Sequence, residues 1–362
     1  MSLIPNNTER LARARTDLQM GVPVVLRDGA DAALVMAAET LAQVRLDDLR
    51  ALPGRPALTI TSRRAETLKA RAYDGDLARV LLPADADAGW VRCVADPARD
   101  LDSPMKGPLA TEREGTADLH RIAVDLVKSA RLLPAAIVLT GAPETFAGIV
   151  DLTTLLAKRT AQLLGDMASL SLVAAARVPL SVSQAGRVHV FRPEDGGEEH
   201  YAVEIGAPDR AAPVLARLHS ACFTGDVLGS LKCDCGPQLQ AALAKMGQEG
   251  AGVLLYLNQE GRGIGLANKM RAYALQDQGF DTVEANHRLG FEDDERDFRI
   301  GAELLKKMGF SQVRLMTNNP NKITMMESQG LEVTDRVPLK VGEGALNRAY
   351  LATKAKKSGH LL

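Results

Sequence analysis

Three of the four cysteines of this chain lie in one short stretch, HSACFTGDVLGSLKCDCG at residues 219–236. Thiolates gathered in a chain with so few cysteines indicate a metal site rather than a disulfide framework, so the fold has to bring Cys222, Cys233 and Cys235 together. Three protein ligands leave a tetrahedral Zn²⁺ with an open position, which is typical of catalytic zinc. His219 is a candidate fourth ligand. The alternative is three buried free thiols, although the polar and turn-forming residues around them argue against it.

Length and charge limit the classes of protein to consider. A chain of 362 residues is long enough for two domains. A formal net charge of −1 gives no field that favours nucleic acid or a membrane surface as partner. The start, MSLIPNNTERLARARTDL, lacks an apolar core of signal-peptide length, and no run of about eighteen apolar residues occurs. We therefore expect a cytoplasmic protein, in which cysteines stay reduced and available to a metal.

The first half is rich in alanine and leucine, and helical patterns alternate there with short apolar runs. The patterns predict an α/β or α+β domain that ends near residue 178. Cys93 stands alone in this half and is interpreted as a packing residue. The predicted elements are a helix at 8–20, a strand at 22–26, helices at 30–42 and 117–130, a strand at 135–139, a helix at 153–164 and an apolar run at 169–175.

Two alternating runs, around 188–190 and at 201–205, flank a Gly/Glu-rich turn and predict a hairpin that opens a second domain, residues 179–362. A strand is expected at 214–218, a helix at 238–249 and a buried strand at 252–257. The last of these leads into a turn with three glycines, Gly261, Gly263 and Gly265, before a helix from Leu266. Strand, glycine turn and helix N-terminus together suit a phosphate group. The string matches neither the Rossmann nor the P-loop motif, and glycines required only by a tight turn are an equal alternative.

Two further blocks carry polar residues suited to a phosphate chain. A cluster of charges at 293–299 follows an apolar turn, and a solvated surface is its ordinary explanation. A strand at 312–315 is followed by Thr317 and Lys322, with two asparagines between them. Ligands of such sheets tend to bind at the carboxyl ends of strands, so these side chains favour a phosphate site there. A plain Asn-Pro turn is the competing interpretation.

Several motifs of the second half together resemble the GTP cyclohydrolase II family. The match extends over about residues 180–362 almost without gaps, and several separate motifs occur in the same order as in the family. The motifs are HSACFTGDVLGSLKCDCGPQL, YLNQEGRGIGLANKMRAYALQDQGFDTVEAN, LGFEDDERDF, TNNPNK and NRAYLATKAKKSGHLL.

The resemblance implies an α+β fold with two mixed α/β domains and a zinc-dependent hydrolysis of GTP. Cys222, Cys233 and Cys235 match the family's zinc ligands, and water activated by the zinc would attack C8 of guanine and release formate. Mg²⁺ would bridge the phosphates, and Tyr273 matches an active-site tyrosine beside the base. The nucleotide-contacting positions of the family correspond to Arg217, Leu218, His219, Ser220, Ala221, Gln238, Glu260, Gly261, Arg262, Thr282, Thr317 and Lys322.

The family also releases pyrophosphate, and here the resemblance leaves one role open. Asp294 matches the position of a proton acceptor and Arg296 that of a nucleophile towards the α-phosphate. A guanidinium group stays protonated in nearly all proteins, so Arg296 could instead clamp the charge of the transferred phosphoryl group. Many members of the family have Glu where this chain has Ala221. We still expect turnover, with nucleotide affinity the parameter that this change affects.

The first half resembles 3,4-dihydroxy-2-butanone 4-phosphate synthase in DLQMGVPVVLRDGADAALVMAAETL and AVDLVKSARLLPAAIVL. That family uses an acidic cluster between a strand and a helix, where this chain has only the loop 28–31. A His-Thr-Glu motif of the family is also lost, and Leu119, His120 and Arg121 stand near its place. The prediction for residues 1–178 is therefore the fold without the activity, with His120 an ordinary surface or packing residue.

Three functions follow, in order of preference. The first is a zinc hydrolase acting on GTP, with a silent first domain and a homodimeric assembly, as in the family. The second is a non-catalytic nucleotide-binding or regulatory paralogue, which Ala221 alone motivates. The third is a bifunctional enzyme that also makes 3,4-dihydroxy-2-butanone 4-phosphate.

Overall fold

The computed structural model describes residues 3–344, 347 and 361, and this part of the chain forms two compact units. The first consists of Met1–Asp166 with Ala267–Asp293, and the second of Met167–Leu266 with Asp294–Leu362. Each unit contains one β-sheet with helices, so the predicted mixed α/β composition is confirmed. The compact units change at Asp166/Met167. The domain boundary predicted at 178/179 stays a prediction. No helix within the described residues is long and apolar enough to cross a membrane.

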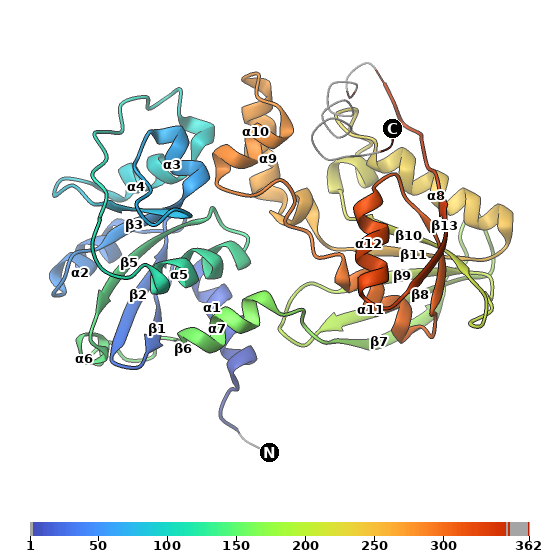
Figure 1. Cartoon of the computed structure of the whole chain (residues 1–362), viewed down its shortest axis with the longest axis horizontal. Helices are drawn as coiled ribbons and strands as arrows, with labels where there is room; N and C mark the ends of the chain where they lie inside the picture. The colour runs from blue at the N-terminus through green and yellow to red at the C-terminus, as the bar shows by residue number, and fades with distance from the viewer. Residues whose placement is uncertain (1–2, 345–346, 348–360, 362) are drawn as a thin grey trace. The chain divides into compact units, whose positions relative to one another are not determined.

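The first unit is built on a six-stranded sheet of order β4-β3-β5-β2-β1-β6 (Figure 1). Its pairs are antiparallel, except that β1 and β6 run parallel. The helices α1, α5 and α7 contribute apolar side chains to the main core against this sheet. The strands are β1 (Val24–Asp28), β2 (Asp31–Ala37), β3 (Ala57–Thr61), β4 (Leu77–Leu81), β5 (Ala135–Gly141) and β6 (Thr154–Leu156).

Apolar periodicity predicted some of the helices of the first unit, whereas α2, α3, α4, α6 and α10 were not predicted. The helix predicted at 8–20 is α1, and the one predicted at 117–130 is α5. The helices are α1 (Asn7–Gln19), α2 (Gln43–Ala51), α3 (Ser62–Leu68), α4 (Ala88–Ala95), α5 (Asp118–Ser129), α6 (Pro143–Phe146), α7 (Ala157–Gly165), α9 (Leu266–Asp277) and α10 (Thr282–Leu289), with a 3₁₀ turn, η1 (Pro97–Arg99).

The helix predicted at 30–42 is wrong, because this segment forms strand β2. Gly29 adopts a φ of +63° and turns the chain sharply, so that Asp28 pairs with Asp31 in a hairpin. β2 lies between β1 and β5, and six of its seven residues are buried. A strand buried on both faces has no alternation of polar and apolar residues, so its apolar run cannot be told from a helix by period.

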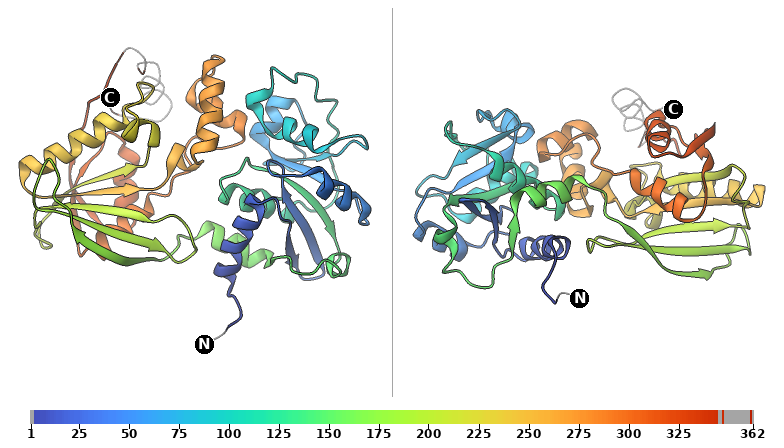
Figure 2. Two further views of the ribbon diagram at one scale, coloured as in Figure 1. Left: turned by 180° about the vertical axis from the view of Figure 1, so that it is seen from behind. Right: turned by 60° about the horizontal axis from the view of Figure 1, so that its bottom comes forward.

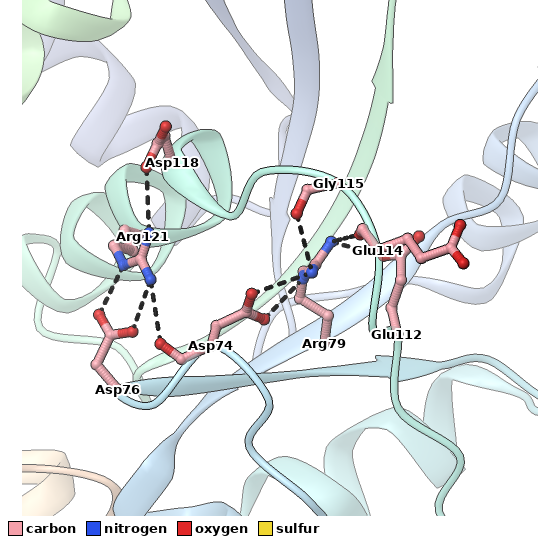
Figure 3. Close-up of polar contacts among 8 residues, drawn as sticks. All are labelled: Asp74, Asp76, Arg79, Glu112, Glu114, Gly115, Asp118 and Arg121. Atoms are coloured by element: carbon pink, nitrogen blue, oxygen red, sulfur yellow. Dashed lines mark hydrogen bonds and ion pairs between the residues drawn. The ribbon is translucent and has the colours of Figure 1, made fainter.

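A polar network that includes the buried Arg79 links the loops around β4 and the start of α5 (Figure 3). Arg79, only 2% exposed, forms a two-pronged ion pair with Asp74 at 2.9 and 3.1 Å and reaches Glu112 at 3.2 Å. Arg121 on α5 forms a similar pair with Asp76. Because Arg79 and Arg121 reach partners on the loops before β4 and before α5, the network ties these loops together.

The second unit contains a seven-stranded sheet of order β13-β12-β10-β11-β9-β8-β7. The four strands from β13 to β11 run parallel, and β9, β8 and β7 are added antiparallel, with β8 and β9 forming the predicted hairpin. The strands are β7 (Leu170–Arg177), β8 (Gly186–Pro193), β9 (His200–Ile205), β10 (Val214–Ser220), β11 (Gly252–Leu257), β12 (Gln312–Met316) and β13 (Glu332–Val337).

Helices cover both faces of this sheet (Figure 2). α8 (Cys235–Glu249) packs on one face around Leu215 and Met246, whereas α11 (Arg299–Lys307) and α12 (Pro320–Ser328) pack on the other. The central strand β10 is therefore buried on both sides. Since side chains alternate along a strand, Arg217 and His219 share the α8 face with Leu215.

Candidate active site

The predicted site residues of the second unit lie on β10, on the helices α8 and α12, and on loops that leave one edge of its sheet. β10, β11 and β12 run parallel, so their carboxyl ends meet at the same edge. The loop 221–234 follows β10, the loop 258–265 follows β11 and the loop 317–319 follows β12. Ligand sites of such sheets lie outside the carboxyl ends of the strands.

The three cysteines of the first loop form a compact cluster. The ligand atoms of Cys222, Cys233 and Cys235 all lie within 4.8 Å of one another, and the sulfurs of Cys222 and Cys233 are 3.7 Å apart. Two thiolates on one tetrahedral zinc, each with a Zn–S bond of about 2.3 Å, are separated by about 3.8 Å. The Cys222–Cys233 pair thus has the spacing of two ligands on one zinc, and the third sulfur lies close to both.

Gly225 makes room for this cluster. A Cβ atom at this position would lie 2.8 Å from the Cys233 sulfur, 2.9 Å from Cys235 Cβ and 3.0 Å from the Cys222 sulfur. The backbone of the loop therefore lies directly against all three cysteines, and only glycine fits without a shift.

The clustering of the cysteines also affects the protonation of their thiols. Hydrogen bonding with Cys222 raises the pKa of both Cys233 and Cys235, and burial adds to the effect. Neighbouring thiolates repel one another, whereas a coordinating metal ion deprotonates them. Three cysteine sulfurs gathered in this way are the donor set that zinc takes in proteins.

His219 does not complete the cluster. Its Nε2 lies 3.0 and 3.1 Å from the two carboxylate oxygens of Asp226, and within the described chain the group able to hold a metal comprises the three cysteines. The structure thus gives no support to His219 as a fourth ligand. Asp226 also accepts a hydrogen bond from Tyr256. Neither residue was among the site residues predicted from the sequence, and Tyr256 lies within an apolar run, where it does not stand out.

Arg217 and Gln238 meet on the α8 face of β10. The guanidinium of Arg217 donates to Gln238 and, at 3.0 Å, to the carbonyl of Met316, while its Nε has no partner in the described part of the chain. Burial lowers the pKa of Arg217 to about 10, so it remains a cation at neutral pH. Asp234 lies close enough to offset part of this burial effect.

The glycine turn after β11 adopts a strained conformation. Gly261, Arg262 and Gly263 have φ values of +64°, +65° and +95° in the turn η3 (Glu260–Gly263). Arg262 is not glycine, so this left-handed geometry costs about 1 kcal/mol or more, which is common at functional sites. Glu260 fixes the turn by accepting hydrogen bonds from Phe223 N–H at 2.6 Å and from Gly261 N–H at 2.9 Å.

Close packing brings the predicted charge cluster to this turn. Glu295 N–H donates to the Arg262 carbonyl at 3.0 Å, and a Cβ on Gly263 would meet the Glu295 backbone at 2.7 Å. The next residue, Arg296, forms a two-pronged ion pair with Asp294 and lies 3.4 Å from the Ser220 hydroxyl.

The Asp294–Arg296 pair is ionic. Burial by itself raises the pKa of Asp294, but the hydrogen bonds and charge of Arg296 outweigh it, so the pKa is lowered. The guanidinium also lies 4.8 Å from the centre of the Phe298 ring. Both contacts stabilise the protonated form of Arg296.

Thr317 and Lys322 lie at the carboxyl end of β12, as predicted. Lys322 donates to the Leu218 carbonyl at 3.2 Å and lies 4.5 Å from the Phe298 ring. Thr317 accepts a hydrogen bond from Asn319 N–H at 3.0 Å, which shapes the turn into α12. The Asn-Pro turn, which was the alternative to a phosphate site here, therefore also describes the local geometry.

The remaining predicted residues separate into two groups. Ala221 continues the line of β10, with its N–H donating to the Leu257 carbonyl at 2.8 Å. Tyr273 on α9 and Thr282 at the start of α10 belong to the first unit, and their predicted contact with the nucleotide stays a prediction. The tail motif at 347–362 lies outside the described residues, apart from Asn347 and Leu361.

Comparison with known proteins points to one family. The family model described as GTP cyclohydrolase II matches residues 172–338. A GTP cyclohydrolase-2 from Azospirillum brasilense is 44% identical over 358 residues, which cover 96% of this chain and 93% of the relative. A GTP cyclohydrolase-2 from Azotobacter vinelandii is 55% identical over 194 residues, 54% of this chain and 93% of that protein.

One solved structure is also similar along most of the chain. It is a two-domain 3,4-dihydroxy-2-butanone 4-phosphate synthase from A. baumannii, with 15% sequence identity and a TM-score of 0.33. The match covers 90% of this chain and 98% of that one. A similarity this low carries no argument about activity, so the predicted relationship of the first half stays a prediction.

Proposed function

Because the chain belongs to the GTP cyclohydrolase II family, we propose that it hydrolyses GTP and opens the imidazole ring of guanine. The products are 2,5-diamino-6-hydroxy-4-(5-phosphoribosylamino)pyrimidine, formate and pyrophosphate, and the reaction is the first step of riboflavin biosynthesis. The observation that carries the proposal is the three-cysteine cluster at the carboxyl edge of the second sheet, where a catalytic metal is required.

Cys222, Cys233 and Cys235 hold one zinc ion in this proposal. Zinc bound by three protein ligands would supply a Lewis acid that lowers the pKa of water towards neutrality. The spacing of the sulfurs and the absence of a side chain at Gly225 support this assignment.

The nucleotide binds along the same edge. Arg217 and Lys322 place two buried cations beside the carboxyl ends of β10 and β12, where they offset the charge of a triphosphate with its Mg²⁺. The left-handed turn after β11, residues Gly261 to Gly263, brings its glycine backbone and Arg262 to the same edge. The further substrate-binding residues are Leu218, His219, Ser220, Ala221, Gln238, Glu260, Gly261, Arg262, Thr282 and Thr317, with Tyr273 beside the base.

Arg296 acts as a clamp on phosphoryl charge rather than as a nucleophile. A protonated guanidinium has donors and no lone pair with which to attack phosphorus. The ion pair with Asp294 and the Phe298 ring both favour that protonated form. Asp294 orients the clamp by accepting its hydrogen bonds, and in the reaction it takes the role of proton acceptor that the family resemblance implies.

The first domain is catalytically silent in this proposal. The acidic cluster of 3,4-dihydroxy-2-butanone 4-phosphate synthase needs a loop, whereas here Asp28 and Asp31 pair directly across a two-residue turn. The bifunctional alternative predicts that the protein releases formate from ribulose 5-phosphate. Because the acidic loop is missing, we expect no formate from that substrate.

The non-catalytic alternative depends on Ala221 alone. Its contact with Leu257 is made by the backbone, which any residue at this position provides. The loss of the usual glutamate thus leaves the path of the chain between β10 and Cys222 intact, and we favour the enzyme.

The test uses zinc-replete protein, GTP and Mg²⁺, with formate and pyrophosphate as readouts. We expect one formate per GTP consumed, and loss of both bound zinc and formate in Cys233→Ser. The matched control is Cys93→Ser, which alters a half-buried thiol of the first unit and should retain zinc and turnover. Formate release by Cys233→Ser at the rate of the control would overturn the proposal.

A further inference from the structure

The carboxylate of Asp226 accepts hydrogen bonds from three groups of the site. Asp226 lies in the turn η2 (Phe223–Val227), between the first and second cysteines, and its side chain is 3% exposed. It accepts hydrogen bonds from His219 Nε2 at 3.0 Å, from the Tyr256 hydroxyl at 3.0 Å and from Cys222 N–H at 3.0 Å. A buried carboxylate with three donors is held in a single orientation.

These contacts decide which ring nitrogen of His219 carries the proton. A carboxylate offers only acceptors, so the Nε2 that faces it is the protonated, donating nitrogen. Burial lowers the pKa of His219, although Asp226 opposes this effect, and the ring is therefore neutral at pH 7. In a neutral ring the other nitrogen, Nδ1, then has the free lone pair.

The orientation of the ring is fixed as well as its tautomer. His219 and Tyr256 are directly paired between β10 and β11, and their rings stack with centroids 5.6 Å apart and planes inclined by 22°. Asp226 holds one edge of the imidazole while Tyr256 covers one face. The same carboxylate also holds the backbone N–H of Cys222, so the ring and the first cysteine are fixed relative to each other.

We propose that Asp226 is a positioning residue of the reaction site, which holds His219 as the Nε2–H tautomer and leaves Nδ1 as a hydrogen-bond acceptor for a donor group of the nucleotide. This inference rests on the proposed function. Asp226 does not itself touch the substrate; it acts through His219 and through the loop that carries Cys222. Tyr256 supports the same arrangement, with a smaller effect.

The direct test is the ring tautomer, measured by long-range ¹H–¹⁵N spectra of the full-length, zinc-loaded protein with ¹⁵N-labelled histidine. The His219 signals are identified by their loss in His219→Gln. We expect an unprotonated Nδ1 and a protonated Nε2. A wild-type spectrum with the proton on Nδ1 would overturn the proposal whether or not GTP is turned over, so this result is independent of the proposed function.

The variant test is Asp226→Asn. The asparagine oxygen can keep the Cys222 N–H while its NH₂ group faces Nε2, which favours the opposite tautomer. We expect the proton to move to Nδ1, zinc content to be retained, and kcat to fall about 10–100-fold with KM changed less than about 3-fold. Asp335→Asn, an exposed aspartate on β13, is the matched control and should match the wild type.

Two outcomes of the variant test contradict a positioning role. Unchanged kcat in Asp226→Asn would exclude it, and loss of zinc together with activity would indicate a purely structural role in the cysteine loop. Tyr256→Phe keeps the stacked ring and removes one hydrogen bond to the carboxylate, so it should retain the tautomer and lose less than about 10-fold in kcat. A changed tautomer in Tyr256→Phe would assign the positioning to the tyrosine instead.

Discussion

At the scale of single residues, the cysteine cluster depends on a position without a side chain. Gly225 has an ordinary negative φ, so it is required for space rather than for backbone freedom. The sequence predicted the three ligands from their number and spacing. It did not identify Gly225 or Asp226, because a glycine and an aspartate in a turn are common and their contacts depend on how the loop folds back.

Gly225→Ala should weaken zinc binding. The added methyl group would lie within 3.0 Å of two sulfurs and of Cys235 Cβ, so the ligands have to shift. Such overpacking costs about 1–3 kcal/mol, which corresponds to roughly 5–150-fold in affinity. Competition with a chromogenic zinc chelator measures the change. Gly148→Ala, in an exposed turn with nothing near a new Cβ, is the control; equal affinities would contradict the proposed packing.

At the scale of elements, the sequence correctly predicted the strands whose carboxyl ends carry polar residues to the edge of a sheet. Each apolar run from 214 to 316 ends in the chemistry-bearing loops, and the parallel order of β10, β11 and β12 brings these together. The secondary structure expected from the sequence was wrong where burial on both faces removes the periodicity, as in β2, which was predicted as a helix. The strand order of the sheets could not be derived either, because pairing between distant segments leaves no local pattern.

Helix α5 carries a buried histidine that should make the first unit sensitive to acid. His120 is 4% exposed and its Nδ1 has no partner in the described part of the chain. Burial, aided by the charge of Arg79, lowers its pKa to about 4, although Asp74 opposes the shift. The unfolded chain binds a proton below about pH 6.5, whereas the folded chain does not until about pH 4, so stability falls as the pH decreases through this window.

The prediction is a difference between wild type and His120→Gln. Between pH 7 and pH 5 the wild type should lose about 1–2 kcal/mol more unfolding free energy of the first unit than the variant, because only the wild type titrates at this position. Urea unfolding at the two pH values measures it. Parallel losses in both proteins would show that His120 does not titrate as its burial requires.

At the scale of the whole molecule, the compact units do not follow the order of the chain. Residues 267–293, which include two predicted nucleotide contacts, pack within the first unit. Arg271 on α9 pairs with Glu39 at 2.9 Å and with Asp96 at 3.2 Å. No local pattern in the sequence predicts this arrangement, since the charges that pair are far apart along the chain. The homodimer and the cytoplasmic location remain predictions.

Arg271→Ala should loosen this segment. Removal of the guanidinium leaves two partly buried carboxylates without their partner, so amide hydrogen exchange in 267–293 should rise at least about 5-fold. Exchange in the sheet of the second unit should not change. Arg99→Ala, a largely exposed arginine of the same unit, is the control, and an unchanged exchange rate in α9 would show that these ion pairs do not hold it.

The central claim is that the cysteine cluster serves hydrolysis at C8 of guanine. It is tested most directly with GTP carrying ¹³C at C8, zinc-loaded protein, and NMR detection of formate. The proposed function predicts that the label leaves as formate in proportion to the GTP consumed, and that Cys235→Ser releases none. Consumption of GTP with the label retained in the nucleotide product, or no consumption by protein with one zinc per chain, would contradict it.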